Sequence, residues 1–296
     1  MTNILLLGNS GQVGWELRHA LAPLGNLVSF GRAECDLTQL DVLRTLLRAQ
    51  RPQVIVNAAA YTAVDKAETE PTLAHRINAE VVSVLAEEAA RKGILLVHYS
   101  TDYVFDGTKL TEYTESDETN PLSVYGRTKL AGEEAIRASG CDHLLFRTSW
   151  VFAARGGNFL RTILRLASER EKIHIVSDQY GAPTSAELIA DVTALCLHEM
   201  LFHPESRMEK TGTYHLVSEG ATSWHEYAVF IVREAIQRGW SFSVRPDTII
   251  PIPTKDYPAQ ALRPLNSRLS TEKLRTSFGL TLPAWQYLVT RVMDTL

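Results

Sequence analysis

The 296-residue sequence has few cysteines, no run of basic residues and no long apolar segment. Its three cysteines (Cys35, Cys141 and Cys196) are far apart and lack CxxC spacing, which argues against a disulfide framework. The formal charge of -4, with lysine and arginine spread along the chain, gives no general attraction to nucleic acid or to an anionic membrane. No apolar run approaches the roughly 20 residues that span a bilayer, and the first residues lack the features of a signal peptide. We therefore expect a cytoplasmic globular protein that binds neither nucleic acid nor membrane.

Motifs of two other enzyme classes are also missing. No GxxxxGK[ST] phosphate loop occurs, which argues against a kinase or an ATPase. His198 and His203 flank a segment that resembles the zinc motif HExxH, but they stand at i and i+5. Histidines at that spacing do not share a helix face as i and i+4 do, so no histidine pair has the spacing of zinc ligands.

The sequence does contain short apolar runs that alternate with helical patterns. Helical spacing follows the first run and recurs in residues 73–89, 130–138 and 224–237. This alternation predicts right-handed crossovers and an α/β fold with a doubly wound parallel sheet. The expected strands are residues 4–7, 26–30, 54–57, 94–99, 143–148 and 212–217.

A GxxGxxG turn lies between the first expected strand and the first helix. Gly8, Gly11 and Gly14, with Gln12 and Val13 between them, form the turn. Glycines here permit a tight turn, a close approach of backbone to a pyrophosphate and close packing of the helix on the sheet. The helix N-terminus adds free N–H groups for the anion. The motif therefore predicts a Rossmann site for a dinucleotide.

The end of the second expected strand bears on the choice of dinucleotide. NAD sites usually place an acidic residue there to hold the ribose 2′-OH. In this sequence Gly31 and Arg32 follow the strand, and the nearest acidic residue is Glu34. Arg32 can pair with a 2′-phosphate, and Asp36 and Leu37 can border the adenine. We expect NADPH to be preferred, with use of NADH left open.

Tyr125 and Lys129 form a Tyr-x-x-x-Lys pair. In a helix they share a face, where an ammonium favours the ionised tyrosine and brings its pKa towards the working range of an acid-base group. Thr101 closes the fourth expected strand, at the edge where ligands bind in open α/β sheets. Ser100 should point to the opposite face, so Thr101 is the predicted third catalytic residue.

The second half of the chain has a different texture, with prolines clustered in residues 246–264. We interpret that cluster as extended segments and loops that shape a pocket. The expected plan is an NAD(P)-binding Rossmann domain in residues 1–150 and a smaller C-terminal substrate-binding lobe in residues 151–296. Within the second part, a segment at about 186–218 is expected to return to the Rossmann domain.

Seven collinear segments resemble the dTDP-4-dehydrorhamnose reductases of the extended short-chain dehydrogenase/reductase family. The resemblance implies NAD(P)H-dependent reduction of the C-4 ketone of dTDP-4-dehydro-β-L-rhamnose, the last step of dTDP-L-rhamnose synthesis. A nucleotide sugar is then the substrate. The segments are residues 11–17, 57–68, 100–107, 121–133, 147–152, 178–184 and 263–269.

The same resemblance implies roles for further residues. Thr62, Val64 and Trp150 are expected around the sugar, together with Thr101 and Asp102 at the strand end. Arg263 and Arg268 are candidates for the nucleotide diphosphate, which a guanidinium can bind in bidentate fashion. The cofactor is expected to touch Ala60, Tyr61, Tyr99, Tyr125 and Lys129.

The family is also associated with Mg²⁺ bound by glutamates between the two copies of a homodimer. Glu187 stands at a matching position, but Gln286 occupies the place where another glutamate is expected. The sequence therefore supports a metal weakly, with Glu187 as its one candidate ligand.

Two other functions stay open on the sequence. A C-4 reductase of another nucleotide-linked ketosugar would share the same catalytic residues. An NADP-binding regulatory subunit of another enzyme would share the fold, although it need not keep Thr101, Tyr125 and Lys129.

Overall fold

The computed structural model describes residues 1–296, apart from the side chain of Pro204. Its centre is a six-stranded sheet with the order β10-β5-β4-β3-β1-β2. Every neighbouring pair in this sheet is parallel. The doubly wound α/β sheet expected from the sequence is therefore confirmed. The strands are β1 Asn3–Leu7, β2 Asn26–Phe30, β3 Val54–Asn57, β4 Leu95–Thr101, β5 His143–Thr148 and β10 Gly212–His215.

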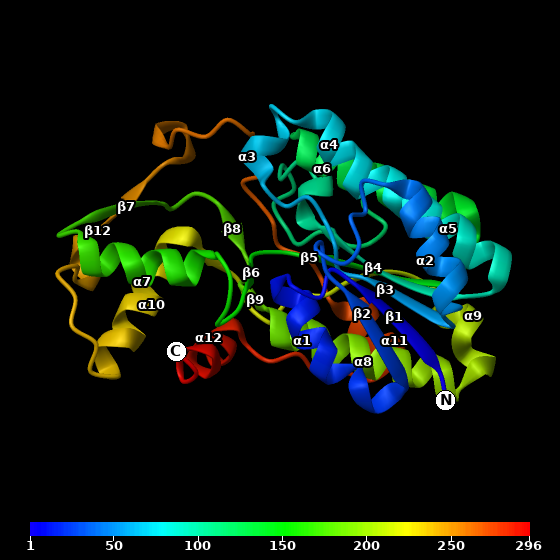
Figure 1. The fold of residues 1–296 in the computed structure, drawn as a ribbon. Helices are drawn as coiled ribbons and strands as arrows, with labels where there is room; N and C mark the ends of the chain where they lie inside the picture. The colour runs from blue at the N-terminus through cyan, green and yellow to red at the C-terminus, as the bar shows by residue number, and fades with distance from the viewer.

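Helices cover both faces of this sheet (Figure 1). All residues of β3, β4 and β5 are buried, as near-continuous apolar runs predict for a parallel sheet between two helical layers. Alternate strand residues enter two separate cores, one below α1 and α8 and one below α2 and α5. The covering helices are α1 Gln12–Ala20 and α8 Ala186–Phe202 on one face, and α2 Leu40–Gln50, α5 Val81–Lys92 and α6 Val124–Ser139 on the other.

The long helix expected before Gly93 is interrupted by a π-helical segment. The chain runs from α4 (Pro71–His75) through the π segment η2 (Arg76–Glu80) into α5. A π turn inserts an extra residue into the helix and re-aims the side chains around it. Here it directs the buried Asn78 towards both the residues after β3 and helix α6.

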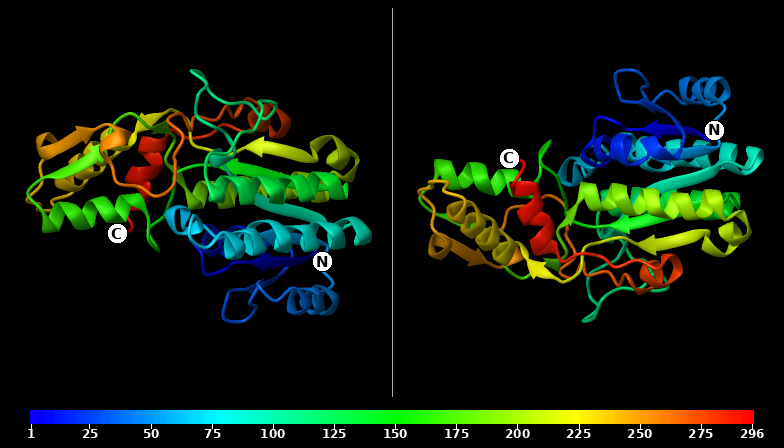
Figure 2. Two further views of the ribbon diagram at one scale, coloured as in Figure 1. Left: turned by 90° about the horizontal axis from the view of Figure 1, so that it is seen from above. Right: turned by 90° about the horizontal axis from the view of Figure 1, so that it is seen from below.

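A smaller lobe lies beside the carboxyl edge of the sheet (Figures 1 and 2). Its helices α7 (Phe159–Glu169) and α10 (Trp224–Gln237) pack against each other and share the large core with α1 and α8. In this lobe β7 (Ile173–Val176) pairs in parallel with β12 (Ile249–Ile252). The proline-rich stretch therefore contains a paired strand, where only extended segments and loops were expected.

Short elements complete the chain. No helix of the described residues is long and apolar enough to cross a membrane. The remaining elements are α3 Val64–Ala67, β6 Val151–Phe152, β8 Tyr180–Gly181, β9 Thr184–Ser185, α9 Arg207–Lys210, β11 Thr222–Ser223, α11 Glu272–Phe278 and α12 Trp285–Met293.

The strand order reverses at β1. The chain places β2 on one side of β1 and then crosses to β3 on the other. Such a switch point leaves a crevice outside the carboxyl ends of β1 and β3, and open α/β sheets bind ligands in such a crevice. The GxxGxxG turn follows β1 at this crevice.

Candidate active site

The turn after β1 is built so closely that two of its positions accept only glycine. Gly8 has φ +85°, and a Cβ there would lie 2.6 Å from the backbone nitrogen of Ala59. A Cβ on Gly14, in the first turn of α1, would lie 2.0 Å from the carbonyl oxygen of Gly8. The glycines thus bring helix, turn and β3 into contact, and α1 directs its N-terminus at the crevice.

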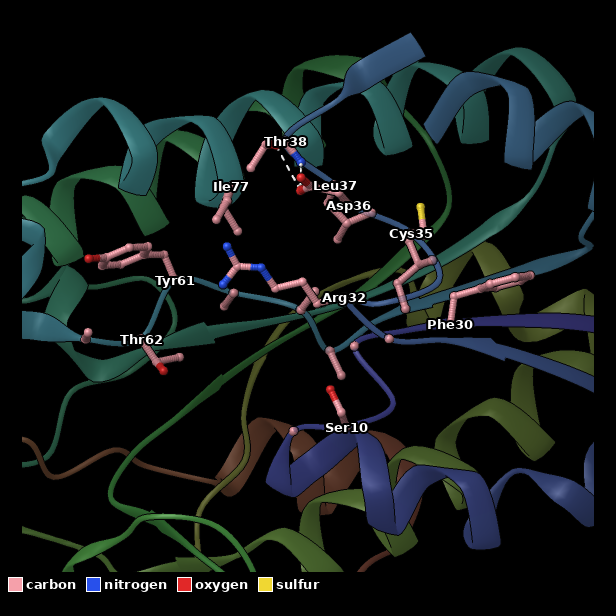
Figure 3. A pocket seen from close by; sticks show the side chains of 18 of the residues that line it. Ser10, Phe30, Arg32, Cys35, Asp36, Leu37, Thr38, Tyr61, Thr62 and Ile77 are labelled. Atoms are coloured by element: carbon pink, nitrogen blue, oxygen red, sulfur yellow. Dashed lines mark hydrogen bonds between the residues drawn. The ribbon is translucent and has the colours of Figure 1, made fainter. Parts of the chain in front are cut away.

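A cavity of about 370 Å³ opens over this turn (Figure 3). It is formed by the turn after β1, the segment after β2 and the segment after β3. Gly8, Gly11, Arg32, Asp36, Leu37, Ala60 and Tyr61, all expected at the cofactor, line it together with Thr62, which was expected at the sugar. The sequence-predicted residues of three separate segments therefore meet in one cavity.

Charged side chains after β2 are arranged unequally around the cavity. The guanidinium of Arg32 extends into it, towards the side of Tyr61 and Ile77 (Figure 3). The Glu34 carboxylate instead accepts a hydrogen bond from the Gly31 N–H at 2.8 Å. Glu34 is not among the lining residues. Arg32 is therefore the cationic side chain that this segment presents to a ligand at the end of β2.

Asp36 also lines the cavity, but its carboxylate is engaged within the loop. It accepts hydrogen bonds from the Thr38 N–H at 3.0 Å and the Thr38 hydroxyl at 2.8 Å. These bonds lower the pKa of Asp36 below its usual value. The carboxylate thereby fixes the loop that forms this wall.

The π segment joins the cavity to helix α6. Asn78 accepts a hydrogen bond from the Tyr61 N–H at 2.8 Å and donates one to the Thr128 hydroxyl at 3.1 Å. Its amide thus fixes the backbone after β3 relative to the helix that carries Tyr125 and Lys129.

Helix α6 begins one residue before Tyr125. The Ser123 hydroxyl caps it by accepting a hydrogen bond from the Gly126 N–H at 3.1 Å. Tyr125 and Lys129 occupy i and i+4 of this helix. Lys129 is 1% exposed, and its ammonium donates a hydrogen bond to the Tyr99 carbonyl oxygen at 2.6 Å. Burial lowers the pKa of Lys129 to about 8, although nearby Glu133 acts in the opposite direction.

Thr101 ends β4 at the same edge. Burial raises the pKa of Tyr125 to about 12, opposite to the lowering expected from the sequence, while a hydrogen bond with Thr101 acts to lower it. The Thr101 hydroxyl also donates to the carboxylate of Asp102 at 3.1 Å. Burial raises the pKa of Asp102 to about 6, and its second carboxylate oxygen is buried with no hydrogen-bond partner. The structure thus places Thr101 and Tyr125 beside one buried carboxyl group, that of Asp102.

A cross-lobe ion pair lies near these residues. The ring of Tyr103 stands edge-on to that of Tyr125, with the centroids 5.6 Å apart. Arg263 lies near enough to Tyr103 to favour its ionised form, and it pairs with Asp65 of α3 at 2.6 Å. Arg263, a candidate ligand of the diphosphate, is therefore already bound to a carboxylate. That carboxylate belongs to Asp65, the residue after Val64.

Trp150 has a strained backbone and a stacked ring. Its φ of +48° is uncommon for a bulky residue. Its ring stacks on that of Trp224, with centroids 3.5 Å apart and planes at 12°. A Cβ at Gly181 would lie 2.6 Å from the Trp150 ring. Trp224 and the bare backbone of Gly181 thus determine where the indole lies.

Other sequence-predicted residues lie apart from this group. The hydroxyl of Tyr99 is 2.9 Å from that of Thr193 on α8, so its ring belongs to the core and only its carbonyl reaches Lys129. Val13 also packs against the core, and Gln12 accepts a hydrogen bond from Asn158 at 2.8 Å.

Arg268 is separate as well. Its guanidinium donates to the Asn266 side chain at 2.8 Å, and it lines a second cavity of about 710 Å³. That cavity shares no lining residue with the cavity over the glycine turn.

The residues around Glu187 do not fit a magnesium ion. Arg291 holds the Glu187 carboxylate in an ion pair at 2.5 Å, which lowers the pKa of that carboxyl. The described residues contain no group of three or more histidine, cysteine, aspartate or glutamate side chains that could hold a metal. The Glu187 carboxylate is thus already neutralised by a guanidinium of the same chain. The weak expectation of a metal at Glu187 is therefore not supported.

Two residues at the site escape the sequence analysis. His98 contacts Lys129, with its Nε2 atom 3.1 Å from the lysine Nζ. The one feature of the sequence that could have pointed to His98 is that it is a lone histidine within the apolar run of β4. Trp224, which stacks on Trp150, gives no comparable signal because its position opens an ordinary amphipathic helix.

Comparison with known proteins places this geometry among nucleotide-sugar enzymes. A family model described as RmlD substrate binding domain matches residues 1–296. A dTDP-4-dehydrorhamnose reductase of Escherichia coli strain K12 is 48% identical over 298 residues, covering 99% of this chain and 98% of the relative. One of Burkholderia thailandensis is 50% identical over 286 residues, covering 97% and 96%. The solved dTDP-4-dehydrorhamnose reductase of Bacillus anthracis, in complex with NADP, is 31% identical with a TM-score of 0.87. That comparison covers 100% of this chain and 99% of that one.

Proposed function

This chain belongs to the RmlD substrate binding domain family, and from that premise we propose that it is a dTDP-4-dehydrorhamnose reductase. The reaction is NAD(P)H-dependent reduction of the C-4 ketone of dTDP-4-dehydro-β-L-rhamnose to dTDP-β-L-rhamnose. The observation that supports the proposal is that Tyr125 and Lys129 share a face of α6 near the end of β4, where Thr101 lies and where Lys129 reaches the Tyr99 carbonyl.

Tyr125 is the proposed acid. Because burial raises its pKa to about 12, the hydroxyl keeps its proton at neutral pH and can donate it to the ketone oxygen. A nicotinamide cofactor, when bound, would supply the hydride for the new C–H bond at C-4. The carbonyl thereby becomes a secondary alcohol, and Tyr125 is left as a phenolate.

Lys129 and Thr101 support that proton transfer. The Lys129 ammonium stabilises the phenolate electrostatically, and with a pKa of about 8 most of it is protonated at neutral pH. The Thr101 hydroxyl, 4% exposed at the strand end, can hydrogen-bond the ketone oxygen and orient it towards Tyr125.

We assign recognition of the nucleotide sugar to the lobe that carries Trp150 and to the segment after β3. A deoxysugar has an apolar methyl group and C–H faces, which suit an aromatic ring, and Trp224 stacks behind Trp150. Thr62 lines the cavity over the glycine turn, and Val64 begins α3 two residues later. Arg263 is next to Tyr103 and can shift from Asp65 to a diphosphate, which a guanidinium binds in bidentate fashion.

NADPH is the cofactor that the cavity favours. Arg32 extends into it, while the nearby Glu34 is bound to the Gly31 N–H. A 2′-phosphate therefore meets a positive charge and no free carboxylate at this wall.

The test is NADPH oxidation by the purified protein with dTDP-4-dehydrorhamnose, beside GDP- and UDP-linked ketosugars, followed by analysis of the product sugar. We expect one NADPH consumed for each dTDP-L-rhamnose formed. Tyr125→Phe should lower turnover by about 10²–10⁴-fold while the dissociation constant for NADPH stays the same.

Three results would argue against the assignment. The opposite configuration at C-4, or a preference for another nucleotide, would make the protein a different ketosugar reductase. Tight NADPH binding without turnover of any ketosugar would favour a regulatory subunit.

A further inference from the structure

A histidine lies buried beside the catalytic lysine. His98 sits in the middle of β4, beneath α6, and is 1% exposed. Its Nε2 atom is 3.1 Å from Nζ of Lys129, and its Nδ1 atom is 3.2 Å from the side-chain nitrogen of Asn57 on β3. Both ring nitrogens therefore face groups that can donate hydrogen bonds. A neutral imidazole has only one nitrogen that accepts a hydrogen bond, so it cannot accept from both groups.

The backbone fixes the direction of this chain of hydrogen bonds. The Ala59 N–H donates to the side-chain oxygen of Asn57 at 3.2 Å, so the amide nitrogen of Asn57 must face His98. That nitrogen is a donor only, and Nδ1 of His98 must accept from it. A neutral His98 then carries its hydrogen on Nε2 and directs it at Lys129.

We infer that His98 is a positioning residue for Lys129: with its tautomer set by Asn57, it presents an N–H group to the lysine nitrogen and favours the neutral amine. The neutral amine has one lone pair, which accepts from His98, and it still donates to the Tyr99 carbonyl at 2.6 Å. An ammonium has no lone pair and meets the imidazole N–H unfavourably. The inference rests on the proposed function, in which Lys129 stabilises the Tyr125 phenolate.

The other groups around the amine leave room for this effect. On α6, Tyr125 and Glu133 lie one turn before and one turn after Lys129. Glu133 is bound to Arg147 of β5 at 2.7 Å and is thereby largely neutralised. Asn57 on β3 and the Tyr99 carbonyl on β4 carry no net charge. His98 itself stays neutral, because burial and the charge of Lys129 hold its pKa well below the usual value.

The contact has a consequence for the pH dependence of the reaction. Reduction needs the ammonium, so turnover falls as pH rises through the pKa of Lys129. The N–H group of His98 lowers the pKa of Lys129, so turnover falls at a lower pH than it would without this contact. The same contact allows Lys129 to release a proton near neutral pH after Tyr125 has donated the proton of its hydroxyl.

The experiment compares the pH profile of kcat/KM in the wild type and in His98→Gln, whose amide can turn its oxygen to the ammonium. We expect the alkaline limb to move up by about one pH unit, the effect of one close polar partner. The dissociation constant for NADPH at pH 7 should change less than about twofold, because Lys129, with a pKa of about 8, is mostly protonated at that pH in both proteins. The matched control is His143→Gln, which alters a buried histidine of β5 whose Nδ1 atom lies 2.8 Å from the Cys141 carbonyl oxygen.

An unchanged alkaline limb in His98→Gln, or an equal shift in His143→Gln, would overturn the inference. A second measurement needs neither a variant nor turnover. Nitrogen-15 spectra of the imidazoles in the wild-type protein report which ring nitrogen is protonated. We expect His98 to stay neutral with its hydrogen on Nε2 from pH 6 to pH 9.

A hydrogen on Nδ1, or an imidazolium, would refute the assignment of His98 even in an active enzyme. Conversely, a wild type that reduces no nucleotide ketosugar would refute the proposed function, while the imidazole spectrum would still decide the state of His98.

Discussion

Arg32 is the residue on which cofactor preference depends. Its guanidinium extends into the cavity over the glycine turn and has no carboxylate partner among the ion pairs of the described residues. Arg32→Ala should raise the KM for NADPH about tenfold, the loss expected for one charge-assisted hydrogen bond, and leave the KM for NADH nearly unchanged. Steady-state kinetics with both cofactors measure this. Arg233→Ala, on the exposed face of α10, is the control, and equal effects on the two cofactors would show that Arg32 does not bind the 2′-phosphate.

Asp102 makes stability depend on pH in an unusual direction. Its pKa is raised from 3.8 to about 6 by burial, so between these values the folded protein binds more protons than the unfolded chain. The free energy of unfolding must therefore fall as pH rises from about 4 to 6. Asp102→Asn removes this loss and should stabilise the protein at pH 7 by about 1–3 kcal/mol, with no gain near pH 4.

Thermal unfolding of the variant and the wild type at several pH values tests this. Asp106→Asn is a control of opposite sign, because hydrogen bonds, first among them that from the Thr108 N–H, hold the pKa of Asp106 near 2. The stability that they supply is present above pH 4 and is lost as pH falls through about 2. A destabilised Asp102→Asn at pH 7 would contradict the unfavourable burial of its charge.

At the scale of single elements, the packing of α1 on the turn after β1 controls the cofactor site. A Cβ on Gly14 would enter the space of the Gly8 carbonyl, and backbone on both sides leaves no room to yield. Gly14→Ala should displace the N-terminus of α1, cost about 1–3 kcal/mol of stability and weaken NADPH binding at least about tenfold. Gly157→Ala is the control, because a Cβ there meets nothing within 4 Å. Titration of NADPH fluorescence measures both variants, and normal binding by Gly14→Ala would show that the helix N-terminus does not hold the phosphates.

At the scale of the whole molecule, the ion pair between Asp65 and Arg263 connects the two sides of the active site. It joins α3 to a segment 198 residues further along the chain. Asp65 also accepts a hydrogen bond from the Ala261 N–H at 3.0 Å, so two contacts hold that segment over the site.

Arg263→Met should raise the KM for the nucleotide sugar about tenfold, a cost of ~1.4 kcal/mol, because the segment is no longer held near Tyr103. The dissociation constant for NADPH should stay within about twofold, since neither Arg263 nor Asp65 lines the cofactor cavity. Arg233→Met controls for loss of a surface charge. A parallel loss of NADPH affinity would assign Arg263 to general stability instead of to the substrate.

The fold could be predicted closely from the sequence where local chemistry determines it. β2, β3 and β5 begin and end at the expected residues, because each is an apolar run that polar or turn-forming residues bound. Helix α10 also matches, since the Ser223 capping box marks its start. β12 lies where extended segments and loops were expected, but its pairing with β7 was not predicted, because Pro251 lacks an N–H group; an edge strand can contain proline where no N–H is needed.

The residues of the candidate site also fall into two groups, those predicted from local sequence and those found only in the structure. The sequence by itself determined the glycine turn, the Tyr125–Lys129 spacing and the strand end at Thr101, because each depends on a few consecutive residues and a regular backbone period. Only the tertiary structure decided that Arg263 binds Asp65, that Trp224 stacks on Trp150 and that His98 faces Lys129. Those partners come from distant segments, and which side chains meet depends on the order of the strands and on how the helices cross them, which no local pattern records.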